Sequence, residues 1–167
     1  MTTLSAQPDI DLMKQVNRQF VTGVTVVTAM DEGIPRGLAV NAFSSISLAP
    51  ATVMVCVQHT SSTHDCLFRA DHLAINILST DQLDVVNTFA RKSDNKFKDL
   101  EWEAGPFGSP LISRSSAQME VEIRERLQAS THTVFICRVV HAAVTETPPM
   151  VYSAGTFFDG GALAPLG

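Results

Sequence analysis

The sequence predicts a mainly β protein, a closed or nearly closed antiparallel barrel with peripheral helices. Segments with strand character outnumber helical segments by roughly two to one. Three of these segments follow one another closely between residues 23 and 57, which favours antiparallel pairing. The 167 residues, 45% of them apolar, suit one domain with its own core and tails at about 1–10 and 155–167.

An amphipathic helix is expected at the N-terminus, followed by strands. Four apolar residues recur there at helical spacing: Leu12, Met13, Val16 and Phe20. Asp9 is the candidate N-cap, and the helix should end near Gly23. Three strands are then expected, at residues 23–29, 37–47 and 52–57. The last of them is apolar enough to be covered on both faces.

Helices and strands alternate in the middle of the chain. Ser62 and Asp65 have the spacing of a capped helix start, and Ser79 and Gln82 predict a second helix that ends near Arg91. A long irregular connection is expected over 92–110. Strands are predicted at 72–78, 119–124, 133–140 and 150–152. The strand at 133–140 should pack on the core and on a second subunit, because both of its faces are apolar.

Composition narrows the classes of partner. The 12 basic and 17 acidic residues give a net charge of −5, without a basic cluster that could follow nucleic acid. Only 17% of residues are charged, which predicts an apolar surface for a homodimer. Three distant cysteines, Cys56, Cys66 and Cys137, predict a reducing cytoplasm and no disulfides. Neither a signal peptide nor a membrane span is expected.

Familiar catalytic motifs are missing from the sequence. The glycines form neither a dinucleotide-binding fingerprint nor a phosphate-binding P-loop, and there is no zinc protease or serine hydrolase motif. His59, His64 and Cys66 lack a second cluster that would complete four ligands. No metal site is therefore predicted.

Two segments are suited to holding a nucleotide. The hydroxyl cluster 60–63 precedes a helix start and could donate to phosphate oxygens; alternatively, Ser62 only caps the helix. In segment 37–48, small and hydroxylated residues alternate with apolar ones, so a flat heteroaromatic ring could lie against its main chain. The alternative is an ordinary strand with Ser44 and Ser47 facing water.

At these segments the chain resembles the short-chain flavin reductases that serve two-component monooxygenases. The resemblance runs from Val16 to Tyr152. It rests on a set of matching segments in the family's order: Phe20–Thr28, Pro35–Leu48, Asn76–Leu78, Phe89–Ala90, Lys96–Phe97, Gly108–Leu111 and His132–Ile136. It implies the FMN-binding split β-barrel, an antiparallel Greek-key barrel, and an NAD(P)H-dependent reductase that passes hydride to FMN or FAD and supplies a partner monooxygenase.

The resemblance also implies roles for individual residues. The isoalloxazine would border Gly37, Leu38, Ala39, Asn41 and Ala42, largely through the main chain. The flavin phosphate would be held by Ser61 and Thr63, in a loop that also contains Gln58, His59, Thr60 and Ser62. Phe89 and Ala90, from this chain or a neighbouring subunit, would lie along the ribityl or phosphate end. His132 would act beside the nicotinamide, and Tyr152 would also contact the substrate.

The chain departs from the family pattern around these residues. Ser130 and Thr131 replace the usual Gly-Asp before His132, and Cys137 stands where Gly is common. Segment 153–155 lacks the usual basic residue. Two alternatives therefore remain: a flavoprotein that retains its flavin and reduces another acceptor, such as a corrinoid or an iron chelate, and a non-catalytic flavin-binding module. In the latter, His132 would be a wall residue.

Overall fold

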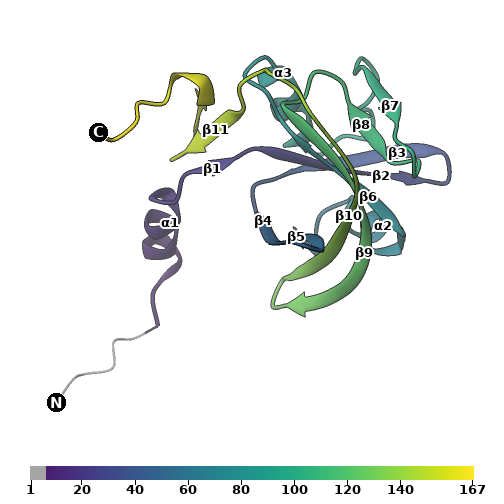
Figure 1. Ribbon diagram of the computed structural model, residues 1–167. Coiled ribbons are helices and arrows are strands. Elements are labelled where there is room, and N and C mark those ends of the chain that lie inside the picture. The colour runs from purple at the N-terminus through teal and green to yellow at the C-terminus, as the bar shows by residue number, and fades with distance from the viewer. Residues whose placement is uncertain (1–6) are drawn as a thin grey trace.

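The structure, a computed structural model, describes residues 7–167 and confirms a mainly β fold (Figure 1). The strands are β1 (Thr22–Gly23), β2 (Thr25–Asp31), β3 (Ile34–Val40), β4 (Phe43–Leu48), β5 (Ala51–Gln58), β6 (His72–Ile77), β7 (Trp102–Ala104), β8 (Pro110–Ile112), β9 (Ala117–Ala129), β10 (His132–Val144), β11 (Met150–Ser153) and β12 (Thr156–Asp159). The helices are α1 (Ile10–Arg18), α2 (His64–Arg69), α3 (Leu83–Phe89) and a 3-10 turn, Gly160–Ala162.

Seven antiparallel strands curl into a split barrel, in the order β3-β2-β6-β9-β10-β5-β4. The chain connects the two edge strands through Asn41 and Ala42, where the predicted strand 37–47 was expected to be continuous. That expectation was wrong, because β3 pairs with β2 and β4 pairs with β5. At the break, Phe43 N donates to Asn41 O and Cys56 N donates to Ala42 O.

Two apolar clusters stabilise the molecule. The larger one fills the barrel with buried side chains such as Val55, Leu73 and Phe135. The second joins the ends of β2 and β6 to α3, β8 and β11, and includes Val26, Leu78 and Phe89. Since burial of one such side chain contributes about 1.5–3 kcal/mol, the second cluster holds α3 firmly beside β3.

Helix α1 extends away from the barrel (Figure 1). Asp9 is its N-cap, as predicted, and accepts a hydrogen bond from Leu12 N at 2.7 Å. The helix ends at Arg18, earlier than expected, and none of its residues is buried. The chain then enters β1, which pairs with β11. The apolar stripe that predicted this helix is therefore not buried within residues 7–167.

The predicted capping residues of the next two helices were wrong. Thr63, not Ser62, precedes α2, and its side chain makes no cap hydrogen bond. Helix α3 starts at Leu83, after Gln82. The Gln82 side chain accepts from Ser79 N at 2.9 Å, so this pair stabilises the turn before α3.

The observed strand boundaries differ most from the predicted ones where exposed polar residues interrupt the alternation of apolar and polar side chains. Strands β9 and β10 form a long hairpin that extends beyond both predicted ranges. Strand β12 was missed, because Thr156–Asp159 lies in the predicted C-terminal tail and pairs only with the short β11. The connection 92–110 is irregular over most of its length, but contains β7 and the start of β8.

The two strands expected to be apolar on both faces are buried on one face and half-buried on the other. In β10, Phe135 is fully buried, whereas Val134 and Ile136 are partly exposed. Their cross-strand neighbours on β5, Cys56 and Met54, are also partly exposed. Within the described part of the chain, no helix is long and apolar enough to cross a membrane.

Candidate functional site

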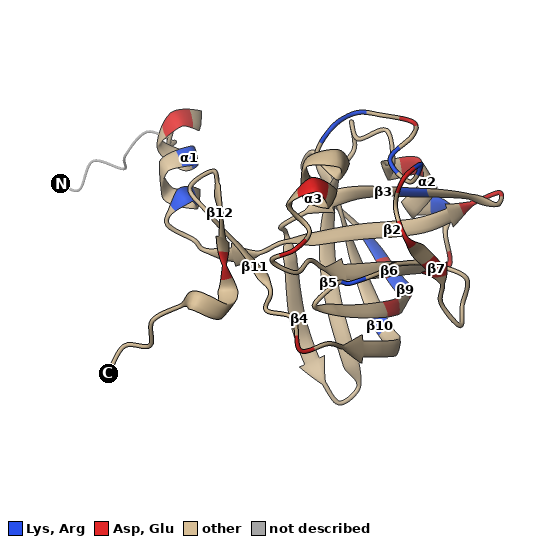
Figure 2. Ribbon diagram, turned by 90° about the horizontal axis from the view of Figure 1, so that it is seen from above, with Lys and Arg blue, Asp and Glu red and all other residues tan. Residues whose placement is uncertain are grey.

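A groove follows β3 along the outside of the barrel, and its first section lies beside the loop 58–63. This section is a hollow of about 200 Å³. It is lined by eleven residues: Leu38, Ala39, Gln58, Thr60, Ser61, Ser62, Phe89, Ala90, Arg91, Lys92 and Lys96. Hydroxyls approach it from the loop before α2, and three cations approach it from the loop after α3. Blue segments mark the latter loop next to α2 and β3 in Figure 2.

The middle section is narrower and mostly apolar. It encloses about 150 Å³ between β3, α3 and the β11–β12 hairpin. Its lining residues are Val24, Ala39, Val40, Asn41, Val86, Ala90, Tyr152 and Phe157. An aromatic ring system fits such walls, because they offer apolar contact on both sides.

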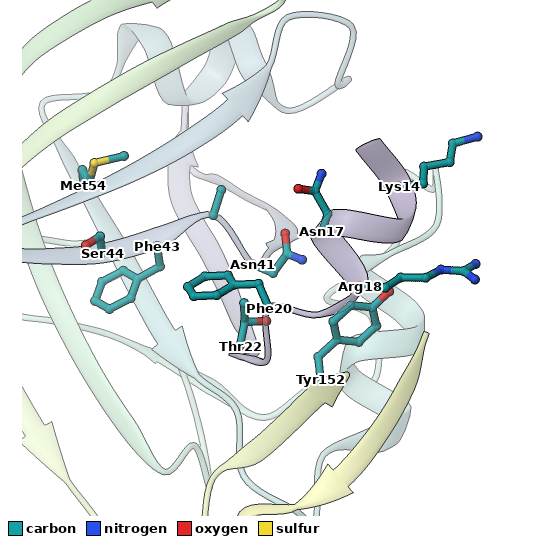
Figure 3. Close-up of a pocket in the computed structure, with 11 residues that line it drawn as sticks. Lys14, Asn17, Arg18, Phe20, Thr22, Asn41, Phe43, Ser44, Met54 and Tyr152 are labelled. Carbon is teal, nitrogen blue, oxygen red and sulfur yellow. The ribbon is translucent and has the colours of Figure 1, made fainter. Parts of the chain in front are cut away.

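The last section opens between α1 and the barrel (Figure 3). It encloses about 550 Å³, within the usual size of a small-molecule site. Its lining residues are Lys14, Asn17, Arg18, Phe20, Thr22, Asn41, Ala42, Phe43, Ser44, Met54 and Tyr152. Figure 3 shows Phe20 and Asn41 at its centre and Tyr152 at its border.

Shared residues connect the three sections into one groove. The first two sections share Ala39 and Ala90, and the last two share Asn41 and Tyr152. The three hollows therefore adjoin one another along β3 and the break after it, with hydroxyls and cations at one end and apolar walls in the middle. This arrangement fits the phosphate of a flavin at the polar end and its ring against the apolar walls.

Most of the residues assigned to the flavin by the resemblance line this groove. They are Leu38, Ala39, Asn41, Ala42, Gln58, Thr60, Ser61, Ser62, Phe89 and Ala90. Phe89 and Ala90 reach it from the same chain, so a neighbouring subunit is not needed to supply them. Tyr152, assigned to the substrate, also lines it.

Gly37 and Thr63 lie below the groove and support it. A Cβ on Gly37 would approach Phe89 Cε1 to 2.9 Å and Thr28 Cγ2 to 3.0 Å, so glycine allows α3 to pack closely on β3. The buried Thr63 hydroxyl donates to Gly37 O at 3.2 Å. The structure therefore uses both residues to hold the loop 58–63 and α3 against β3.

The charge of Lys96 lacks a carboxylate partner at the phosphate end. Its Nζ donates to Gly37 O and Phe89 O, each at 3.2 Å, and no ion pair involves it within residues 7–167. Burial lowers the pKa of this ammonium group, because desolvation disfavours the charged form. An anion bound in the hollow would restore the favourable environment that burial has removed.

The family model of the flavin reductase like domain matches residues 17–161, which include every lining residue of the groove except Lys14. The chain belongs to this family. The split barrel agrees with the fold of other flavin reductases, including flavin reductase PheA2, with a TM-score of 0.84 and 30% identity.

Several relatives in this flavin reductase family cover most of the chain. The reductase component of the flavin-dependent trigonelline monooxygenase of Acinetobacter baylyi is 36% identical over 95% of this chain and 51% of its own length. The FMN reductase (NADH) SmoA of Agrobacterium fabrum is 38% identical over 83% of this chain and 79% of its own. The solved NADH:FAD oxidoreductase SgcE6 of Streptomyces globisporus is 30% identical, covers 98% and 99% of the two chains, and has a TM-score of 0.84.

The chain spans about half the length of the first two curated relatives, 51% and 45%. These flavin reductases therefore contain sequence beyond the part that matches this chain.

His132 lies at the start of β10, opposite Gln58 on β5. Cross-strand partners point to the same face of a sheet, so His132 lies beside the loop end of the groove but is not one of its lining residues. Thr131 Oγ1 is 2.9 Å from His132 Nδ1. Nδ1 is the ring nitrogen engaged by this contact, so Nε2 remains available to a ligand. Thr131 thus orients the histidine where the family usually has an aspartate.

Ser130 occupies the usual glycine position of the same turn. Its φ is +54°, in the left-handed region that costs a residue with a side chain about 1–2 kcal/mol. The turn thus has a backbone conformation that favours glycine, and His132 lies at the first position of β10.

His59, assigned to the flavin loop, points instead toward the barrel. Its Nε2 is 3.2 Å from Thr133 Oγ1, which is 2.8 Å from Nε2 of the buried His64. His64 Nδ1 is in turn 3.1 Å from Asp65 Oδ1, and His59 N donates to Thr131 O at 3.0 Å. This hydrogen-bonded chain fixes the loop 58–63 to β10.

Sequence reasoning missed three cations and part of the apolar wall. Arg91, Lys92 and Lys96 line the first section, and Val86 and Phe157 line the middle. The only signal for Arg91 and Lys92 was their position directly after Phe89 and Ala90, and Lys96 belonged to the matching segment Lys96–Phe97 without a role assigned to it. Their approach to the loop 58–63 depends on how α3 packs on β3, which no local pattern encodes.

Proposed function

We propose that this chain is an NAD(P)H-dependent flavin reductase that uses FMN or FAD and supplies reduced flavin to a separate flavin-dependent monooxygenase. The observation that carries this proposal is the row of three adjoining hollows along β3, with hydroxyls and cations at one end and apolar walls in the middle. Relatives that are an FMN reductase (NADH) and reductase components of monooxygenases support the same activity.

The residues of the chain would bind and orient the two reactants. Ser61, Lys96 and Arg91 would hold the phosphate, while the main chain of 38–42 would support the ring. When bound, the flavin accepts hydride at N5 from C4 of the reduced nicotinamide. The Nε2–H of His132 donates a hydrogen bond beside the site of transfer. The nicotinamide would lie beside His132, as the resemblance implies.

Turnover of nicotinamide with added flavin tests this function. The purified chain is mixed with NADH and excess FMN in air, and the absorbance of the nicotinamide is followed. Rapid oxidation that depends on enzyme concentration is expected, and its absence with both NADH and NADPH would indicate a non-catalytic flavin-binding module. Dialysis of the flavin-loaded protein tests the other alternative, a flavoprotein that retains its flavin. A reductase that supplies a partner should instead release its flavin within minutes.

Ser61→Ala is expected to weaken FMN binding by about 1–3 kcal/mol, the scale of a lost hydrogen bond to a charged group. The combined Ser61→Ala, Thr63→Ala variant should lose more affinity and also some stability, because Thr63 holds Gly37 O. Titration of flavin fluorescence measures the affinity. Ser45→Ala, on the exposed β4, is the control, and equal affinity of the wild type, Ser61→Ala and Ser45→Ala would remove Ser61 from the phosphate site.

We also propose that the chain forms a homodimer. Lys14, Asn17 and Arg18 of α1 face the groove of their own barrel, so the apolar stripe at Leu12 and Val16 points away from it. These side chains are 49% and 53% exposed. A second copy would cover this stripe together with the half-buried face of β5 and β10.

Val16→Glu is expected to convert the dimer into monomers, because it places a charge in the apolar contact. Light scattering coupled to size-exclusion chromatography measures the mass, with Gln15→Glu on the neighbouring helix position as the control. A monomeric wild-type chain, or a Val16→Glu variant that remains dimeric, would contradict this arrangement.

The cytoplasm is the compartment that best suits this protein. All three cysteines are free, and burial raises the pKa of Cys66 to about 11 and that of Cys137 to about 12. Such thiols remain protonated and unreactive at neutral pH. They fit a role in packing within a reducing compartment, where reduced nicotinamide is also available.

A further inference from the structure

A second, smaller hollow adjoins the phosphate end of the groove. It encloses about 40 Å³, enough for a phosphoryl group but not for a nucleoside. Its lining residues are Pro35, Arg36, Gly37, Ser62, Thr63, Ser93, Asp94, Lys96 and Phe97. Ser62 and Lys96 also line the first section of the groove, so the two hollows lie next to each other.

Lys96 lies between these two hollows as their shared cation. Two of its three N–H groups are used by Gly37 O and Phe89 O, which leaves one for a ligand. The two hollows differ in net charge. Two further cations, Arg91 and Lys92, line the first hollow, whereas one cation, Arg36, and one anion, Asp94, line the second. Neither Arg36 nor Lys96 forms an ion pair in the described part of the chain.

We propose that the two hollows bind the two linked phosphates of a diphosphate, and that this chain therefore prefers FAD to FMN. The phosphate nearest the ribityl chain lies by Ser61, Arg91 and Lys92, and the second phosphate lies by Arg36 and Ser93. Lys96 and Ser62 contact both. The adenosine continues over the rim formed by Pro35 and Phe97. This inference rests on the proposed function, because it extends the same flavin site.

Charge and size both support a diphosphate. FMN has a single phosphate, which the first section accommodates without Arg36. The second hollow is too small for a ring but offers a guanidinium, an ammonium and hydroxyls, which are the groups that bind phosphoryl oxygens. The carboxylate of Asp94 offsets part of this charge, so the second site needs Arg36 to attract an anion.

Equilibrium titration with FAD, FMN and riboflavin tests the proposal without turnover. The wild-type chain should bind FAD about tenfold more tightly than FMN, and riboflavin least well. Arg36→Gln should lower the FAD affinity about five- to tenfold and leave that for FMN unchanged. Lys96→Met should weaken both flavins that contain phosphate, and Lys98→Gln, outside both hollows, should weaken neither.

Equal affinity of the wild-type chain for FAD and FMN would overturn the preference, as would an Arg36→Gln variant that weakens both flavins equally or neither. The flavin reductase function would stand in those cases. Failure of every flavin to bind would instead overturn the proposed function. Circular dichroism establishes that each variant is folded, and the wild-type ratio with Arg36→Gln decides the question even if Lys96→Met does not fold.

Discussion

Glu120→Ala is expected to lower the free energy of unfolding by about 2–4 kcal/mol, since it leaves buried donors without an acceptor. Glu120 is fully buried on β9, and its carboxylate accepts from Phe107 N and Ser109 N, both at 2.9 Å. These bonds stabilise the turn between β7 and β8. A Cβ on Gly105 would lie 2.3 Å from Glu120 Oε2, so the turn is built closely around this side chain.

Chemical denaturation measures the loss, and Glu125→Ala provides the control on the same strand, because Glu125 is exposed. The Gly105→Ala variant should also be destabilised, as it pushes the carboxylate out of place. Equal unfolding midpoints for Glu120→Ala and Glu125→Ala would show that the two main-chain bonds contribute little net stability.

His132→Ala is expected to slow hydride transfer by about 100-fold while flavin affinity changes little, the scale of a positioned proton donor. His132 lies beside the groove, opposite Gln58, and the contact of Thr131 with Nδ1 leaves Nε2 available to a ligand. Stopped-flow mixing of flavin-loaded protein with NADH under anaerobic conditions measures the single-turnover rate, and titration measures the affinity.

Thr131→Val tests whether the orientation of the His132 imidazole, and not only its presence, affects the rate of hydride transfer. The variant keeps the shape of the side chain but removes the hydroxyl that contacts Nδ1. Its rate should fall between those of the wild type and His132→Ala, because the ring can then rotate and exchange tautomers. If both variants reduce flavin at the wild-type rate, His132 is a wall residue of the barrel.

Local sequence patterns predicted the helices and strands whose apolar residues recur at the spacing of the face that is buried. The alternation of Met119, Val121 and Ile123 predicted β9, and Asp9 predicted the start of α1. The same patterns failed for β12, which contains only four residues, and for the break at Asn41 and Ala42. Such a break has no local signature, because each half of the segment has normal strand character and only the choice of partner strand differs.

For the candidate site too, local sequence predicted one part, and contacts between distant segments decided the rest. The hydroxyls of 60–63 and the small residues of 37–42 could be recognised in the sequence as groups suited to a nucleotide. The resemblance to the flavin reductases then gave the ligand and placed Phe89, Ala90, His132 and Tyr152 near it. Neither approach identified Lys96 as the cation between two hollows, since its neighbours Gly37 and Ser62 are distant in sequence.

The sequence by itself determined the mainly β class, the family and the residue types that a flavin needs, because hydrophobic periodicity and motif order are local properties of the chain. Only the tertiary structure decided that β3 and β4 belong to opposite edges of one barrel, that Thr63 and Gly37 hold the groove from below, and that cations from the loop after α3 reach its phosphate end. These features depend on which surfaces bury one another, and burial is settled by contacts between distant segments.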